Sequence, residues 1–436
     1  MEEIIKHFFD FELSLSNEEL EYWDIFRHDL FMIVVYGENN KPLGSIVKKN
    51  FIYYVKLFFQ IILAIVKLPF IMIFNKNKRI LFKCSRYKIG NSFIDVNMQD
   101  IEKSFKNKLF TIETYWNIDY IKLLYLKMHR KKNALSAGNV FSDTFVRKIN
   151  NEFNISLQKK FYQERITDFL GETCYYRNLY KILKPRSIFF IQNGIHKGMI
   201  KAAKELQIPI VELQHGEFGV THPAYFYPVG FDKKHIVAAD YLFVWSDFWK
   251  NRINFPGVKI ITMGNSYYFI KKEERENTKK YDFSIISNTL HTPIFDDFLE
   301  NLFETGYNGK ICYKLHPQQK NEYESIKERW AERKNVDVIL FEKNAIDIIK
   351  ESSAIFAIHS TVVFQALDMN CKVILYKAIE EYLSHKDIFS FPNVFVIRTI
   401  EEFINALEKP LNDITTRIYE NFNNEKYNQF LLETGI

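Results

Sequence analysis

The segment that decides the fold is "SIFFIQNGIHKGMIKAAKELQIPIVELQHG", from Ser187 to Gly216. It begins with a short β-rich run ending in Asn-Gly, continues with apolar residues at helical spacing, and ends in a second apolar run before Gln-His-Gly. A strand, a helix and a strand at this spacing predict a βαβ unit, which implies a parallel sheet.

The same alternation continues toward the C-terminus. Two more strands are predicted in "YLFVWS" (Tyr241–Ser246) and "KIITMGN" (Lys259–Asn265). After the charged run "KKEERENTKK", strands and helices alternate again from "YDFSIIS" to "CKVILY". Because 436 residues exceed one ordinary core, we predict two Rossmann-like α/β domains that face a central cleft.

The predicted domains are residues 1–265, residues 266–408 and a helical C-terminal tail over residues 409–436. The N-terminal third shows no clear pattern and is assigned to the first domain. In such an architecture the ligand binds between the domains, at the carboxyl ends of both sets of strands.

The composition narrows the class of protein. Hydrophobic residues make up 47% and charged residues 26%, which is typical of a globular chain. The net charge of +6 suits an anionic substrate or anionic lipid and does not indicate nucleic acid. Four scattered cysteines without a C-x-x-C pair, and an acidic N-terminus without a signal-peptide pattern, predict a cytoplasmic protein with free thiols.

One long apolar segment runs from Phe51 to Phe74. Lys56 and Lys67 interrupt it, and Pro69 would kink a helix there. A buried core helix and a transmembrane span remain alternatives, but a helix lying in the membrane interface fits best, with its lysines reaching toward anionic headgroups. We therefore expect a peripheral position on the inner, anionic face of the cell membrane.

Polar side chains follow two strands of the second domain. "KICYKLHP" places Lys314 and His316 at a strand end, and "AIFAIHSTVVFQAL" places His359, Ser360 and Thr361 between a strand and a helix. A cation, an imidazole, hydroxyls and the N–H groups of a first helical turn are suited to bind phosphate oxygens. A surface lysine and local helix caps are the structural alternative.

These motifs, with "VELQHG" and "THPAYFYP" in the first domain, resemble the bacterial surface-polysaccharide glycosyltransferases of the GT-B fold. That group includes sialyltransferases and Kdo-transferase-like capsule proteins and, more distantly, CDP-glycerol glycerophosphotransferases. The resemblance implies that His316, Ser360 and Thr361 bind the phosphate of a nucleotide-sugar donor and stabilise the departing nucleotide without a metal or other cofactor. The absence of an Asp-x-Asp pair agrees with this. Gln365 stands where many relatives have a glutamate.

The first domain would supply the acceptor side and the general base. His215 and Glu217 are the two candidates for the base, and Gly216 permits close approach of the backbone to a ligand. A purely structural His215 remains an alternative. Asn193 and His222 are expected to line the same cleft.

In the second domain, Glu342 after "VILF" is a candidate for a contact to the ribose. His359 and Gln365 are the further residues expected to line the cleft.

We therefore expect a metal-independent, inverting glycosyltransferase that adds a sugar to a capsule or lipopolysaccharide glycan, free or lipid-linked. A CDP-polyol phosphotransferase would use the same phosphate-binding strand ends. A nucleotide-sugar 2-epimerase shares the two-domain architecture, and a non-catalytic subunit of an assembly complex is the alternative outside catalysis.

Overall fold

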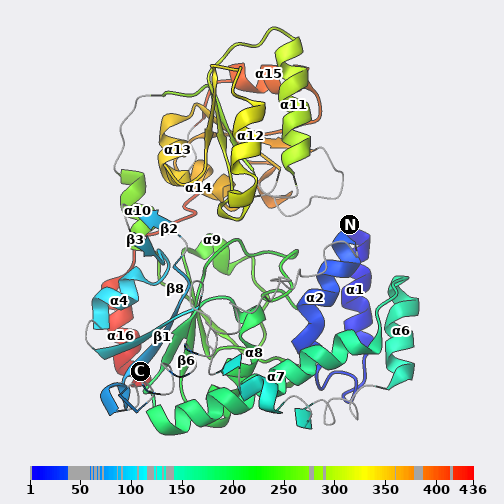
Figure 1. Cartoon of the computed structure of the whole chain (residues 1–436), viewed down its shortest axis with the longest axis vertical. Coiled ribbons are helices and arrows are strands. Elements are labelled where there is room, and N and C mark those ends of the chain that lie inside the picture. Colours follow the sequence, from blue (N-terminus) through cyan, green and yellow to red (C-terminus); the bar gives the residue numbers. More distant parts are fainter. Residues whose placement is uncertain are drawn as a thin grey trace.

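The chain forms two α/β domains stacked along its long axis (Figure 1). The computed structural model describes residues 2–37, 59, 62, 66, 69–70, 73–85, 87–89, 92–105, 108–114, 122–123, 125–129, 132–133, 142–273, 279–287, 291–358, 360–377, 386–412 and 416–436. Each domain contains a six-stranded sheet in which every pairing is parallel. The predicted GT-B type of fold, with two Rossmann-like domains, is confirmed.

The first sheet has the order β4-β1-β5-β6-β7-β8. Its strands are β1 (Arg79–Lys83), β4 (Leu109–Glu113), β5 (Ile188–Phe190), β6 (Ile210–Leu213), β7 (Tyr241–Val244) and β8 (Lys259–Thr262). The predicted βαβ unit is confirmed as β5, α8 (Lys197–Glu205) and β6, with Ile188 paired to Ile210 in parallel register. Strands β5 and β6 are buried throughout because helices cover one face and the C-terminal segment the other.

The remaining elements of the first domain surround this sheet. A small antiparallel pair, β2 (Tyr87–Ile89) and β3 (Ser92–Ile94), lies between β1 and α4 in the chain. The helices are α1 (Glu2–Ser14), α2 (Trp23–Tyr36), α4 (Gln99–Phe105), α6 (Asp143–Phe153), α7 (Lys159–Leu183), α9 (Asp247–Lys250) and α10 (Ser266–Glu273). In Figure 1, α1 and α2 lie beside α6 at one side of the domain, and α7 passes beneath them.

The second sheet has the order β11-β10-β9-β12-β13-β14. Its strands are β9 (Phe283–Ile286), β10 (Ile311–Lys314), β11 (Val336–Ile339), β12 (Ala354–Ala357), β13 (Lys372–Tyr376) and β14 (Val394–Ile397). Its helices are α11 (Thr292–Glu304), α12 (Tyr323–Arg329), α13 (Ala345–Glu351), α14 (Val362–Asp368) and α15 (Ile400–Glu408). The alternation expected from the sequence is observed through β13, and β14 and α15 extend it.

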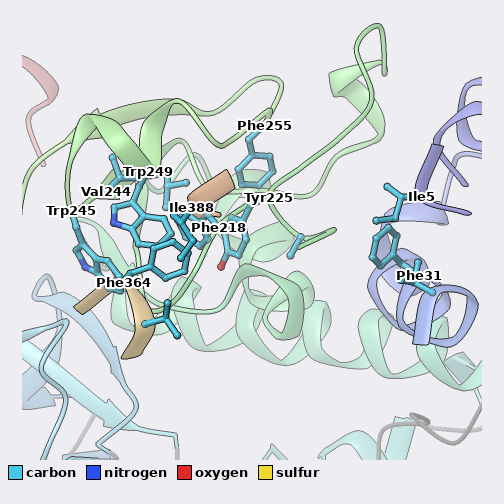
Figure 2. Packing of buried hydrophobic residues seen from close by; sticks show 14 of the residues in the cluster. Ile5, Phe31, Phe218, Tyr225, Val244, Trp245, Trp249, Phe255, Phe364 and Ile388 are labelled. Carbon is cyan, nitrogen blue, oxygen red and sulfur yellow. The ribbon is translucent and has the colours of Figure 1, made fainter. Parts of the chain in front are cut away.

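The C-terminal segment returns to the first domain, where α16 (Asn424–Thr434) packs on the sheet face opposite α8. On its way, the backbone carbonyl of Ile418 accepts hydrogen bonds from the Ser246 hydroxyl and the Trp249 indole. Phe364 of α14 packs its ring 4.8 Å from that of Trp249 (Figure 2). Aromatic packing and backbone bonds therefore join the two domains at α9 and α14.

The N-terminal helix pair is part of the first domain's core. Phe8 on α1 packs against Trp23 and Phe31 on α2, at ring distances of 5.9 and 5.2 Å. The buried guanidinium of Arg27 is paired with the buried carboxylate of Glu12. This organisation was not visible in the sequence, because long-range packing and not a periodic motif produces it.

The expected membrane helix at residues 51–74 falls mainly outside the described residues. Those described there are helical, and the exposed apolar ones are Phe59, Ile62, Val66, Phe70, Ile73 and Phe74. In the described part of the chain, no helix has the length and apolar character needed to cross a membrane. The apolar run that continues this segment ends in β1, whose Ile80, Leu81 and Phe82 are buried in the sheet.

Replacement of Gly264 by alanine should destabilise the attachment of the C-terminal segment. Gly264 has a φ of +82°, and a Cβ there would lie 2.1 Å from the backbone oxygen of Asn421. Gly306, with a φ of +85° and nothing within 4 Å, is the matched control. Gly306→Ala should cost about 1 kcal/mol through backbone strain. Gly264→Ala should cost about 1–3 kcal/mol more because the backbone has to move.

Thermal melting and protease cleavage within residues 416–436 measure the two effects. Equal losses in both variants would show that the close contact with Asn421 does not hold the segment.

Candidate functional site

The loop after β6 is held by Gln214, a buried side chain with two backbone partners. Its amide Nε2 donates to the carbonyl of Gly216 at 2.9 Å, and its Oε1 accepts from the N–H of Trp245 at 3.0 Å. The second bond ties the loop to the end of β7. Gln214 therefore fixes the position of Gly216 and of its half-buried neighbours His215 and Glu217.

His215 and His222 lie around one aromatic centre. The ring of Tyr225 is 6.3 Å from His215, 4.7 Å from His222 and 4.1 Å from Phe218. Both histidines are partly accessible, whereas Tyr225 and Phe218 are buried. The structure thus brings together two imidazoles that the sequence placed seven residues apart, and it sets them over a rigid apolar support.

His316 lies at the end of β10, exposed, and begins the short helix η5 (Pro317–Asn321). Its Nδ1 accepts from the N–H of Gln318 at 3.3 Å, while its own N–H donates to Oε1 of Gln319 at 2.8 Å. With Nδ1 as acceptor, the neutral ring has its proton on Nε2, which is a hydrogen-bond donor. The capping role and the predicted phosphate role use different nitrogens of this ring.

Lys314 has a different environment from the one expected. Its side chain is buried, and Nζ donates to the carbonyls of Leu315 and Leu340 at the ends of β10 and β11. Burial lowers the pKa of this lysine to about 8. Lys314 therefore bonds backbone oxygens of neighbouring strands, and its charge lies beneath the strand ends.

Ser360 and Thr361 precede α14, and both are partly accessible. The Ser360 hydroxyl accepts from the N–H of Val362, the first residue of the helix, at 3.2 Å. Across the domain junction, a Cβ at Gly216 would lie 3.9 Å from the Thr361 hydroxyl oxygen. The strand ends of both sheets therefore meet at this point.

The two other predicted cleft residues near α14 have different outcomes. Gln365 is buried in the second turn of the helix, and its Oε1 has no hydrogen-bond partner among the described residues. His359 lies outside the described residues.

Glu342 follows β11 at a second contact between the domains. It accepts hydrogen bonds from the Tyr323 hydroxyl at 2.8 Å and from the N–H of Leu340 at 2.7 Å. Burial raises its pKa, but these and other backbone hydrogen bonds outweigh burial, so the pKa lies below its ordinary value. The preceding Phe341 packs 6.4 Å from Phe93 of the hairpin β2–β3. Glu342 is thus an ionised, exposed carboxylate beside the junction.

Asn193 lies beneath the site and not on its surface. Its N–H donates to Glu212 at 2.8 Å, and its amide donates to the carbonyl of Ala224 at 3.4 Å. Glu212 is fully buried and also accepts from the Tyr225 hydroxyl at 2.5 Å. Burial raises the pKa of Glu212 to about 7. Asn193 was expected to line the cleft, but the turn after β5 directs it into this buried polar network.

Two residues near the candidate site, Arg252 and His28, were not predicted from the sequence. Arg252 donates to the carbonyl of Phe218 at 3.0 Å, and its guanidinium lies 5.4 Å from the ring of Phe364 on α14. His28 on α2 lies 6.0 Å from the ring of His222. The available signal for His28 was weak: polar Asp24, Arg27 and His28 recur at helical spacing within an otherwise apolar segment.

Among the described residues, no three histidine, cysteine, aspartate or glutamate side chains cluster in a way that would hold a metal ion. The arrangement instead combines an imidazole and hydroxyls on the second domain with imidazoles and a carboxylate on the first. Groups of this kind bind phosphate oxygens and exchange protons.

No protein-family model matches the sequence, and no curated protein matches it. Among solved structures, the chain is similar to the UDP-GlcNAc 2-epimerase of Methanocaldococcus jannaschii in complex with UDP-GlcNAc and UDP, with 14% sequence identity and a TM-score of 0.48. The match covers 82% of this chain and 98% of the epimerase chain. The Neisseria meningitidis UDP-GlcNAc 2-epimerase, bound to UDP-GlcNAc, is 14% identical with a TM-score of 0.47, covering 82% and 99%.

MurG of Acinetobacter baumannii is 11% identical with a TM-score of 0.41, covering 76% of this chain and 91% of its own. At these identities, and with these TM-scores below 0.5, the similarities decide neither the family nor the reaction.

Glu212→Gln should flatten the pH dependence of stability. The folded protein holds the Glu212 proton up to about pH 7, whereas the unfolded chain releases it near the ordinary value of 4.5. The folded state is therefore penalised increasingly as pH rises from about 4.5 to about 7, by roughly 3 kcal/mol in total. Glutamine keeps a donor and an acceptor there and does not titrate.

Unfolding free energies measured from pH 4.5 to 8 should fall less steeply in Glu212→Gln than in the wild type. Exposed Glu3→Gln serves as the control. Parallel curves for Glu212→Gln and the wild type would contradict the raised pKa.

Proposed function

We propose that the protein is a nucleotide-sugar-dependent glycosyltransferase whose reaction occurs at the junction of its two domains. The observation that supports it most is the proximity of Gly216 and Thr361, which brings together the strand ends of both sheets. A transfer reaction needs a group that binds the leaving nucleotide on one side and a proton acceptor on the other. The two domains offer these groups separately.

In this proposal His316 donates from Nε2 to the donor's phosphate, and the hydroxyls of Ser360 and Thr361 bind the same group. Charge develops on that phosphate in the transition state, so fixed donors there lower the barrier. His215 takes the proton of the acceptor hydroxyl, and Glu217 either orients that imidazole or replaces it as base. Inversion at the anomeric carbon follows from a base that activates the acceptor for direct attack.

A nucleotide-sugar 2-epimerase is the second candidate. His215 and Glu217 are half-buried neighbours at one strand end, so the site has two groups able to exchange protons. Epimerisation requires such groups because a proton leaves the sugar's C2 and another returns. The apolar segment at residues 51–74, which favours transfer to a membrane-bound acceptor, is the feature that an epimerase does not need.

Binding of nucleotides is the first consequence to test. Thermal melting with CMP, CDP, UDP, GDP and dTDP should show stabilisation by one of them, about 2.7 kcal/mol at a hundredfold its Kd. His316→Ala should abolish this shift while lowering the stability of the free protein by only about 1 kcal/mol, the cost of losing the capping bond to Gln318. His7→Ala, on helix α1, should preserve the shift.

The nucleotide that binds narrows the donor. CMP would indicate a Kdo- or sialic-acid-type donor, UDP or GDP a hexosyl donor, and CDP a polyol-phosphate donor. No shift with any of them would favour a non-catalytic assembly subunit.

Incubation with the matching nucleotide sugar in D₂O separates the two reactions. A transferase releases nucleotide only when an acceptor glycan is present, and the remaining donor contains no deuterium. An epimerase incorporates deuterium at C2 and needs no acceptor. We expect acceptor-dependent release that persists in EDTA, and loss of that release in EDTA would refute metal independence.

We further propose that residues 51–74 hold the enzyme at an anionic membrane surface, beside a lipid-linked capsule or lipopolysaccharide glycan. The apolar residues of this segment and its lysines support the proposal. Full-length protein should sediment with liposomes containing anionic lipid, and deletion of residues 51–74 should release it. Protein that stays in the supernatant with anionic liposomes would refute the membrane proposal and leave the nucleotide proposal intact.

A further inference from the structure

Helix α2 presents three polar side chains on one face. Asp24, Arg27 and His28 are spaced by three and four residues, so they project from the same side of the helix. Asp24 and Arg27 are buried, whereas the side chain of His28 remains 39% exposed. The face therefore has a buried part that contacts the first domain and an accessible end at His28.

The buried part of this face holds α2 against the other elements of the first domain. The Asp24 carboxylate accepts hydrogen bonds from the Tyr227 hydroxyl, from Lys197 Nζ at 2.7 Å and from the N–H of Val237 at 2.9 Å. Because these three donors come from three separate segments, they fix the position of the Asp24 carboxylate. The position of α2 relative to α8 and to the loop that ends at Tyr227 is fixed by these bonds.

Arg27 fixes the loop that follows His222. Its guanidinium pairs with both oxygens of the Glu12 carboxylate and donates to the carbonyls of Pro223 and Phe226. These carbonyls belong to the turn directly after His222. The same helix that supplies His28 therefore determines where His222 lies.

His28 is positioned beside the candidate site by these contacts. Its ring is 6.0 Å from that of His222, and a Cβ at Gly194 would lie 3.8 Å from its Cδ2 atom. His28 is thus next to the turn after β5 and next to the loop after β6. Gly216, which lies near Thr361 of the second domain, and His222, which lies near His28, belong to the same loop after β6.

The surroundings of His28 indicate which class of ligand fits. The Asp29 carboxylate lies 3.7 Å from His28 Nδ1, and it also pairs with Arg165 at 2.7 Å. The opposite charges of Asp29 and Arg165 balance, so these two residues add no net positive charge beside His28. An imidazole ring offers an N–H donor and, in its neutral form, an acceptor nitrogen as well. Sugar rings present hydroxyls, which both donate and accept hydrogen bonds.

We infer that His28 is a further substrate-contacting residue, which with His222 hydrogen-bonds the hydroxyls of a sugar ring. That this sugar is part of the acceptor rests on the proposed function. Binding of a sugar by the two imidazoles is testable without that statement.

The test uses the full-length protein with ¹³C-labelled histidine, titrated with galactose, N-acetylglucosamine and inorganic phosphate, with and without UDP. The Cε1–H resonance of His28 is assigned by its loss in His28→Gln, and that of His222 in the same way. Both resonances should shift with one of the sugars and not with phosphate. The resonance of His7, a 51% exposed histidine on α1, should stay constant.

The affinity for that sugar should fall about two- to tenfold in His28→Ala, which is the loss of one hydrogen bond. His28→Gln should retain part of the affinity, and His7→Gln all of it. Melting temperatures should be unchanged, because His28 is at the edge of the packed face. An equal loss in His7→Gln and His28→Ala would overturn the inference.

Two other results would also overturn it: no shift with either sugar, or a shift with phosphate alone. Failure of the proposed function has a different signature. In that case no nucleotide stabilises the protein, while the His28 and His222 resonances still respond to sugar.

Discussion

The carboxylate of Asp368 accepts hydrogen bonds from the backbone N–H groups of Ile418 and Tyr419, and the relative position of the two sheets depends on this junction. The carbonyl of Ile418 in turn accepts from Trp249 in the first domain. Asp368 is the last residue of α14, and Thr361 directly precedes that helix. The helix that carries the proposed phosphate-binding end is therefore attached to the first domain at its other end.

The buried pair of Glu12 and Arg27 has a comparable effect within the first domain. Removal of one partner from a fully buried ion pair costs about 3–5 kcal/mol, because the other charge is left without compensation. Arg27 also donates to the carbonyls of Pro223 and Phe226. Loss of Arg27 would therefore also remove the hydrogen bonds that order the loop after His222. The N-terminal helices are thus part of the site's support, although they precede the first sheet in the chain.

Much of the fold could be predicted because its signals are local. The run around Ile188 and Ile210 has the short apolar strands and the helical spacing that a βαβ unit requires. Strand β1 was not recognised because "RILFK" continues an apolar segment that resembles a membrane helix. For the site, His215 and Thr361 were predicted at strand ends, but Asn193 was not predicted to be buried. A residue after a strand can turn toward either side, and packing decides which.

The sequence by itself determined the alternation of strands and helices, the parallel sheets, and the positions of His215, His316 and Ser360 directly after strands of these sheets. These properties follow from side-chain periods of two and 3.6 residues, which act over short segments. Only the tertiary structure decided that Gly216 meets Thr361, that Arg27 bonds a carbonyl 196 residues away, and that His28 lies beside His222. Such pairs depend on how whole elements pack, and no local pattern in the chain specifies them.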